Sequence, residues 1–179
     1  SADDILSHPH CLIGSIDYMC EELERRRETY GISYIAVLDD GENNMAETFA
    51  PLAEERGQSL TLLATPQALS VQGDAAMLAQ LLANLIQNAI NHCPAGTAIV
   101  LGAAPRAKGV ALWVADSGPG IPTAERDKVF ELFYRLDPNR TGGGNGLGMA
   151  LVKAIATRLG AQIVLSDENP GLRVEVIFA

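Results

Sequence analysis

The chain has 179 residues, of which 47% are hydrophobic and 20% are charged, so it is long and apolar enough to form a core without disulfides or a metal. This composition excludes a disordered or collagen-like chain and fits one domain, with or without an appendage. Its 22 acidic and 13 basic residues give a net charge of −9, which disfavours general binding to nucleic acid or anionic lipid.

The cysteines and the hydropathy indicate a compartment. Cys11, Cys20 and Cys93 are an odd number of thiols at no metal-ligand spacing, which predicts a reducing environment. No run of about 18 apolar residues is present to span a membrane. We therefore expect a cytoplasmic location without membrane contact, for a free protein or for the cytoplasmic part of a membrane-bound sensor.

The first part of the chain predicts a strand-helix-strand segment. Residues 11–14 form a short apolar run, Ser15 can cap a helix over about 16–30, and residues 32–38 (ISYIAVL) are typical of a buried strand. The polar stretch 39–44 follows and is typical of a junction. We therefore expect an N-terminal segment over 1–44 and a separate domain over 45–179.

The second part predicts an α+β sandwich with helices on one face of a sheet. Asp74 can cap its longest helix, which ends at about residue 92. The other expected elements are helices over about 45–56 and 148–159, and strands near 59–64, 69–72, 97–104, 109–115, 162–166 and 172–178.

The long helix has an apolar side and an amide-rich side. At helical spacing the apolar side consists of Leu78, Leu82, Leu85, Ile86 and Ala89, and the polar side of Gln80, Asn84, Gln87, Asn88, Asn91 and His92. Solvated helix faces usually carry Glu, Lys and Arg rather than Asn. Amide oxygens can bind a hard cation, and Mg²⁺ needs few protein ligands when phosphates supply the rest. The polar side is therefore either solvated or part of a metal–nucleotide site.

Two glycine-rich stretches follow. Asp116-Ser117-Gly118-Pro119-Gly120-Ile121 comes directly after a strand, so it is either a simple glycine turn or a place where a carboxylate meets the amine of a flat ligand such as adenine. Residues 142–149 (GGGNGLGM) open a helix, whose free amides favour phosphates. The alternative for that stretch is a flexible loop. Arg135 and Arg140, between the two stretches, are either phosphate ligands or solvated charges.

In this order and spacing, the stretches resemble the ATP-binding catalytic domain of sensor histidine kinases. LLANLIQNAINH resembles the asparagine box, DSGPGI the first glycine box, ERDKVFELFYRLD the phenylalanine box and GGGNGLGMALVKAIA the second glycine box. The resemblance covers about residues 46–179 and implies a Bergerat-type two-layer α/β sandwich. It further implies ATP and Mg²⁺ as ligands and a mobile lid over about 134–146.

The resemblance also implies roles for single residues. Asn88 is expected to bind Mg²⁺ beside Asn84, and Asp116 to bind the adenine amine. Beside these, Arg135 is our candidate for a catalytic cation at the γ-phosphate, from its place between the glycine stretches. Phe130 and Phe133 are expected to anchor the lid. The remaining expected nucleotide contacts are Asn91, His92, Gly118, Gly120, Ile121, Gly144, Gly146, Leu147 and Gly148.

Three positions refine this expectation. Asn91 stands where the family often has Lys or Arg near the phosphates, and His92 where it often has an aromatic ring. Asn84 stands where the hydrolysing branches of the superfamily carry a Glu that activates water. An amide cannot accept that proton, so Asn84 favours phosphoryl transfer over ATP hydrolysis.

The N-terminal segment carries a second resemblance and no acceptor motif. Residues 8–40 resemble the C-terminal strand-helix-strand of luciferase-like, deazaflavin-dependent monooxygenases, which suggests a fused or foreign segment; the alternative is a divergent extension. Neither His8 nor His10 lies in a phosphoacceptor pattern. We therefore expect a catalytic domain that donates the γ-phosphoryl group to a His on a separate dimerisation domain and, through it, to a response regulator. The alternative is a nucleotide-binding regulatory module without turnover, such as an anti-sigma-like protein or an inactive fusion.

Overall fold

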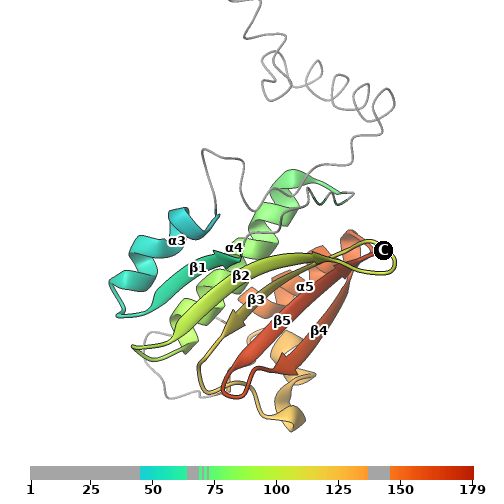
Figure 1. The fold of residues 1–179 in the computed structure, drawn as a ribbon. Coiled ribbons are helices and arrows are strands. Elements are labelled where there is room, and N and C mark those ends of the chain that lie inside the picture. Colours follow the sequence, from blue (N-terminus) through green and yellow to red (C-terminus); the bar gives the residue numbers. More distant parts are fainter. Residues whose placement is uncertain (1–44, 64–68, 70, 72, 137–145) are drawn as a thin grey trace, which may run out of the picture. The chain divides into compact units, whose positions relative to one another are not determined.

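A computed structural model describes residues 45–63, 69, 71, 73–136 and 146–179 (Figure 1). The expected N-terminal strand-helix-strand over 1–44 and the monooxygenase-like stretch 8–40 lie outside these residues, as do Arg140 and Gly144. Within the described part of the chain, no helix is long and apolar enough to cross a membrane.

Five strands form one mixed sheet in the order β1-β2-β3-β5-β4. Strands β1 and β2 pair in parallel, and the other neighbours pair antiparallel. The sheet consists of β1 (Ser59–Leu63), β2 (Ala98–Pro105), β3 (Val110–Asp116), β4 (Gln162–Asp167) and β5 (Leu172–Phe178).

Helices α4 (Ala75–His92) and α5 (Gly148–Arg158) contact each other behind the sheet in Figure 1, and α3 (Met45–Glu54) lies beside β1. Two short 3-10 helices, η1 (Thr123–Glu125) and η2 (Lys128–Phe130), precede α5. Asp74 caps α4 as expected, because its side chain accepts a hydrogen bond from Met77 N at 2.9 Å.

The core lies between the sheet and the helices. The expected apolar side of α4 is buried there, together with alternate residues of β5 such as Val174 and Val176. The strand expected near 69–72 is wrong for its described residues, since Leu69 and Val71 are in no strand. Val71 is nevertheless 2% exposed, because its side chain belongs to the core, and Leu69 packs against that core.

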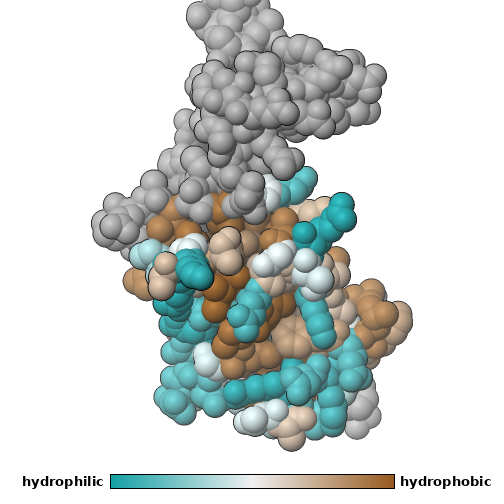
Figure 2. All heavy atoms as spheres, turned by 90° about the vertical axis from the view of Figure 1, so that its right-hand side faces the viewer, coloured by the Kyte–Doolittle hydropathy of each residue, from teal (hydrophilic) through white to brown (hydrophobic). Residues whose placement is uncertain are grey.

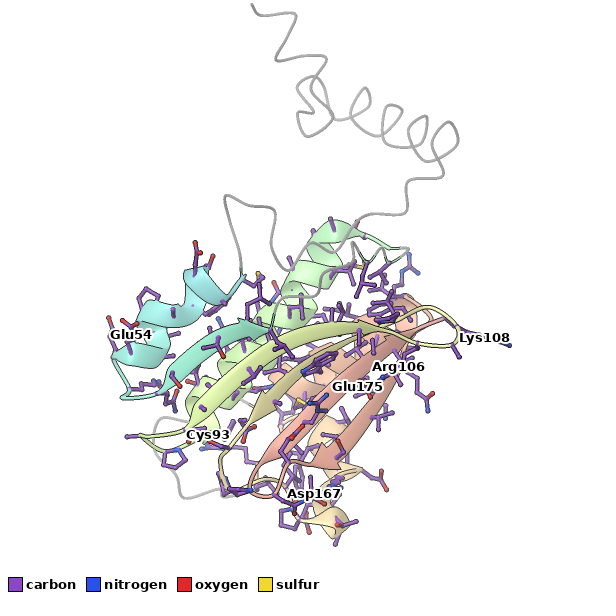
Figure 3. The ribbon with its side chains drawn as sticks, viewed as in Figure 1. Glu54, Cys93, Arg106, Lys108, Asp167 and Glu175 are labelled. Atoms are coloured by element: carbon purple, nitrogen blue, oxygen red, sulfur yellow. The ribbon has the colours of Figure 1, made fainter. Side chains whose placement is uncertain are left out.

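The opposite face of the sheet carries one large aromatic ring. Trp113 lies across Gly102, where an added Cβ would be 2.3 Å from the indole, and Arg173 covers the ring with its guanidinium carbon 4.8 Å from the centroid. Figure 3 shows the ion pair of Arg106 and Glu175 on this face. Trp113 is therefore only 6% exposed although it points away from the helices.

Strand β4 forms one edge of the sheet, and its residues 163–166 are half-buried. In the space-filling view from this side, hydrophobic residues gather in the middle of the face and hydrophilic residues border them (Figure 2). Apolar side chains therefore reach the surface along the edge of the sheet that β4 forms.

Candidate nucleotide-binding site

A cavity of about 550 Å³ lies where α4, the end of β3 and the start of α5 meet. It brings together most of the residues expected to form the site from distant parts of the chain. These are Asn84, Asn88, Asn91, His92, Asp116, Gly120, Ile121, Arg135, Gly146, Leu147 and Gly148.

Three expected site residues with described positions do not line the cavity: Gly118, Phe130 and Phe133. Gln87 and Pro119 also line the cavity; the sequence had placed them in the polar helix side and the first glycine-rich stretch without giving either a role. A mainly apolar part of the wall was missed altogether. That part comes from Leu85, Ala89, Cys93, Val114, Val129, Tyr134, Leu136, Met149, Leu172 and Val174. An apolar residue in a core strand or helix carries no separate signal for a pocket. Tyr134 is different, because it directly precedes Arg135, an expected site residue, and this position could have indicated it.

The polar side of α4 presents amides to the cavity. Asn84 Nδ2 donates to Gln80 O at 2.7 Å, so this amide is partly used within its own helix. Asn88 Nδ2 is buried and has no hydrogen-bond partner in the described structure. A Cβ on Gly148 would lie 2.7 Å from Asn88 Oδ1, so only glycine lets α5 begin this close to the Asn88 amide.

The loop after β3 holds Asp116 by its own backbone. Asp116 Oδ1 accepts from Gly118 N at 2.9 Å, which leaves Oδ2 for another donor. Gly118 is buried because it packs on Cys93, whose Sγ would be 2.5 Å from an added Cβ. Position 171 also requires glycine, since a Cβ added there would be 1.7 Å from Asp116 O. Two tight approaches therefore fix the carboxylate at the cavity wall.

The described residues next to 137–145 are joined by their backbones. Phe133 N donates to Gly146 O at 3.0 Å, and both residues have positive φ, at 64° and 69°. A Cβ on Gly146 would lie 2.7 Å from the Phe133 carbonyl carbon. The Phe133 side chain is 69% exposed, so its backbone rather than its ring holds this position. Phe130 is half-buried, with Lys153 Nζ 5.6 Å from its ring centroid.

A polar contact links η1 to this region. The Tyr134 hydroxyl donates to Glu125, and Lys128 Nζ lies 3.3 Å from Glu125 Oε1. The hydrogen bond from Tyr134, followed by that from Lys128, holds the pKa of Glu125 below its ordinary value. The same bond to Glu125 raises the pKa of Tyr134. At neutral pH, Tyr134 is therefore protonated and Glu125 ionised, as the bond requires.

Several large apolar side chains are exposed in this region, and two of them, Leu136 and Leu147, line the cavity. They come from the residues flanking 137–145 and from the first turn of α5, and we call them the exposed apolar group: Leu132, Phe133, Leu136, Leu147 and Leu151. Such a concentration is typical of a surface that another protein covers.

The described residues contain no group of three or more His, Cys, Asp or Glu side chains that could hold a metal ion. A hard cation can also be held by amide oxygens together with the phosphates of a ligand. The amide side of α4 is a donor set of that kind.

Comparisons with known proteins give consistent matches. The family model described as "Histidine kinase-, DNA gyrase B-, and HSP90-like ATPase" matches residues 73–179. The sensor protein IrlS of Burkholderia pseudomallei is 34% identical over 131 residues, which are 72% of this chain and 27% of that protein. The chain thus spans about a quarter of the length of that relative.

Two solved structures are similar. The mycobacterial sensor histidine kinase MprB has a TM-score of 0.62 and 27% identity, with 74% of this chain and 89% of that chain covered. Full-length ShkA in complex with AMPPNP has a TM-score of 0.65 and 28% identity, with 75% and 29% covered. These likenesses confirm the expected Bergerat-type sandwich. None of these matches supports the monooxygenase resemblance of residues 8–40.

Proposed function

Since the chain belongs to the family of histidine kinase-, DNA gyrase B- and HSP90-like ATPases, we propose that it binds Mg·ATP in the cavity and donates the γ-phosphoryl group to a histidine. The acceptor is a histidine on a separate dimerisation domain, which passes the group to a response regulator. The observation that carries the proposal is the meeting of three features in one cavity: the amides of α4, the Asp116 carboxylate and the glycine-flanked start of α5.

The cavity suits an adenine nucleotide. Its volume of about 550 Å³ is in the range of small-molecule sites. Asp116 Oδ2 is available for the adenine amine, and apolar Ile121, Val174 and Leu172 line the wall for the base. At the other end, the first amides of α5 and its helix dipole favour phosphates, and Gly148 lets them come close.

The residues present also fit Mg²⁺. Asn88 Oδ1 is an oxygen ligand of the right kind, and the unpartnered Asn88 Nδ2 can donate to a phosphate oxygen. When bound, the metal neutralises charge on the phosphates. Arg135, on the cavity wall, adds a side-chain cation near them, which matters because Asn91 brings none.

The transfer itself needs positioning more than acid–base chemistry. The imidazole nitrogen of the acceptor attacks the γ-phosphorus, the bond to the β–γ bridging oxygen breaks, ADP leaves and the imidazole loses its proton to solvent. Asn84 is an amide and takes no proton from water, so this site gives little support to hydrolysis. The amides of α4, Arg135 and the start of α5 hold the phosphate in line.

The exposed apolar group offers a place for the acceptor domain. It borders the cavity, and two of its members, Leu136 and Leu147, line it. A helical acceptor that buries its apolar face here would bring its histidine to the γ-phosphate. A cytoplasmic location, where ATP and response regulators are found, follows from this proposal.

A second candidate is a nucleotide-binding regulatory module without turnover. Asn91 favours it, because an amide at this position of the wall leaves the phosphates with less positive charge. The two functions differ in the fate of the γ-phosphoryl group.

The test is phosphoryl transfer from γ-labelled ATP to an acceptor-histidine domain taken from a related kinase. We expect acid-labile label on that domain with the wild-type chain and none with Asn88→Ala. Transfer should be slow, because no covalent link raises the effective concentration of the acceptor. Tight ATP binding without transfer to any of several acceptor domains would favour the regulatory module.

A further inference from the structure

The end of helix α4 is completed by a side chain from a distant part of the chain. In an α-helix the N–H of residue i+4 bonds to the C=O of residue i, so Ile90 O would accept from residue 94. That residue is Pro94, which has no N–H. Gln58 Nε2 takes its place and donates to Ile90 O at 3.1 Å and to Cys93 O at 2.8 Å. Pro94 O lies 3.4 Å from the same nitrogen.

Gln58 is held in the core for this contact. It is a polar side chain that is only 5% exposed, directly before β1. Its amide hydrogens face carbonyls at the negative end of the α4 dipole, which is the favourable arrangement. Arg56 Nη1 also donates to Ile90 O, at 3.2 Å, and Gly96 N donates to Gly57 O at 2.7 Å. The turn after α3 is therefore joined to the loop after α4.

The joined end of α4 is also a wall of the nucleotide cavity. Asn91, His92 and Cys93 line the cavity, whereas Gln58 does not. Cys93 Sγ packs directly on Gly118, next to the Asp116 carboxylate. Figure 3 labels Cys93 at this end of the helix. Gln58 holds the Cys93 carbonyl, and the Asp116 loop packs on Cys93. Gln58 therefore helps to set the position of that loop.

We propose that Gln58 is a positioning residue for nucleotide binding, which replaces the N–H that Pro94 lacks and fixes the last turn of α4 against the Asp116 loop. The role rests on the proposed function, since it concerns the same cavity. Without the Gln58 donor, Cys93 O loses this hydrogen bond and Ile90 O keeps only the one from Arg56, so the last turn of α4 can move away from the loop. The adenine side of the site then loses its fixed geometry.

The experiment compares ATP affinities by isothermal titration calorimetry, below the melting temperature of each variant. Gln58→Leu keeps the size of the side chain but removes the donor, and it should weaken ATP binding roughly tenfold, as the loss of buried hydrogen bonds would. Gln58→His, whose ring N–H can donate, should bind ATP within about threefold of the wild type. Amide exchange at Cys93 and Gly118 should accelerate in Gln58→Leu and not in Gln58→His.

A matched control separates positioning from general loss of stability. Phe178→Leu changes a buried residue at the end of β5 far from Leu172, and Phe178 does not line the cavity. This variant should be less stable but bind ATP like the wild type. If Gln58→Leu does not fold, Gln58→Asn gives the same comparison, since its amide is one carbon too short to reach both carbonyls.

The outcomes are distinct. Unchanged ATP affinity in Gln58→Leu, or in Gln58→Asn if Gln58→Leu does not fold, overturns the positioning role, and so does an equal loss in Phe178→Leu. Failure of the wild-type chain to bind ATP overturns the proposed function instead. Weak binding in Gln58→Leu with recovery in Gln58→His supports the positioning role.

Discussion

At the scale of single residues, the Asn88 amide links the structure to the proposed chemistry most directly. It lies against the start of α5, where Gly148 leaves room for it, and its nitrogen is buried without a partner in the described structure. A buried unpaired polar group costs free energy unless a ligand uses it. Its position is therefore better explained by binding than by stability.

We predict that Asn88→Ala weakens Mg²⁺-dependent ATP binding by at least about tenfold, since one hydrogen-bonding and ligating group is lost. The free energy of unfolding should change by less than about 1 kcal/mol, because no protein hydrogen bond to Nδ2 is removed. Calorimetric titration with and without Mg²⁺, together with urea unfolding, measures both. Gln80→Ala, an exposed amide on the same helix that does not line the cavity, is the control and should change neither quantity.

Asp116 should determine the choice of base. Its Oδ2 can accept from the adenine amine, whereas guanine presents a carbonyl there and leaves the acceptor unpaired. We expect the wild type to prefer ATP over GTP by about tenfold or more and Asp116→Ala to lose most of that preference. Competition binding with both nucleotides measures it. Equal affinity of the wild type for GTP would contradict the assignment.

At the scale of elements, the contact between Tyr134 and Glu125 connects η1 to the residues before 137–145. The pKa of Glu125 is lowered by the Tyr134 and Lys128 hydrogen bonds, so its contribution is present above the ordinary value of 4.5 and is lost as the pH falls through the lowered pKa. The pKa of Tyr134 is raised, so its contribution is present below the ordinary 10.0 and is lost as the pH rises through the raised pKa. The contact is therefore complete across neutral pH.

We predict that the difference in phenolate absorbance between the wild type and Tyr134→Phe titrates above pH 10. In Glu125→Ala the same difference should titrate closer to the ordinary value, because the hydrogen bond and the carboxylate charge are both gone. Glu131→Ala, which removes only a weaker nearby charge, is the control and should leave most of the shift. A Tyr134 that titrates at its ordinary value in the wild type would show that the contact does not form.

Elements with strong local signals were predicted well, and contacts between elements were not. The N-cap at Asp74 and the apolar side of α4 follow from spacing within one helix, and the structure confirms both. The order β1-β2-β3-β5-β4 depends on strand pairing between residues far apart, such as Trp113 with Glu175, for which local patterns carry no signal. Gln58 was missed for the same reason, because its partners lie more than 30 residues away.

The candidate site was predictable where residue type and spacing carry chemistry. The amides of α4, Asp116 and the glycines before α5 could be named from the sequence, and the structure brings them to one cavity. The apolar wall could not be named, because Val114 and Leu172 look like any core residue of a strand. The expected lid lies largely outside the described residues, and its role stays a prediction.

At the scale of the whole molecule, we predict that the chain alone binds ATP but scarcely turns it over. Asn84 offers no base for water, and the sequence places neither His8 nor His10 in an acceptor pattern. Phosphate release and protein-bound label should both stay at background with γ-labelled ATP. Acid-labile label on this chain would mean that one of its own histidines accepts the group, and rapid phosphate release would place it with the hydrolysing branches.

The indole on the outer face of the sheet has a spectroscopic consequence. Trp113 is the chain's single tryptophan, and it is packed under Arg173, while its neighbour Val114 faces the nucleotide cavity on the other side. Its fluorescence emission should therefore report on the integrity of the sheet and respond little to saturating ATP. Emission would shift to longer wavelength on melting, and Arg173→Ala should change its intensity in the folded state. A large change on adding nucleotide would show that binding reshapes the sheet itself.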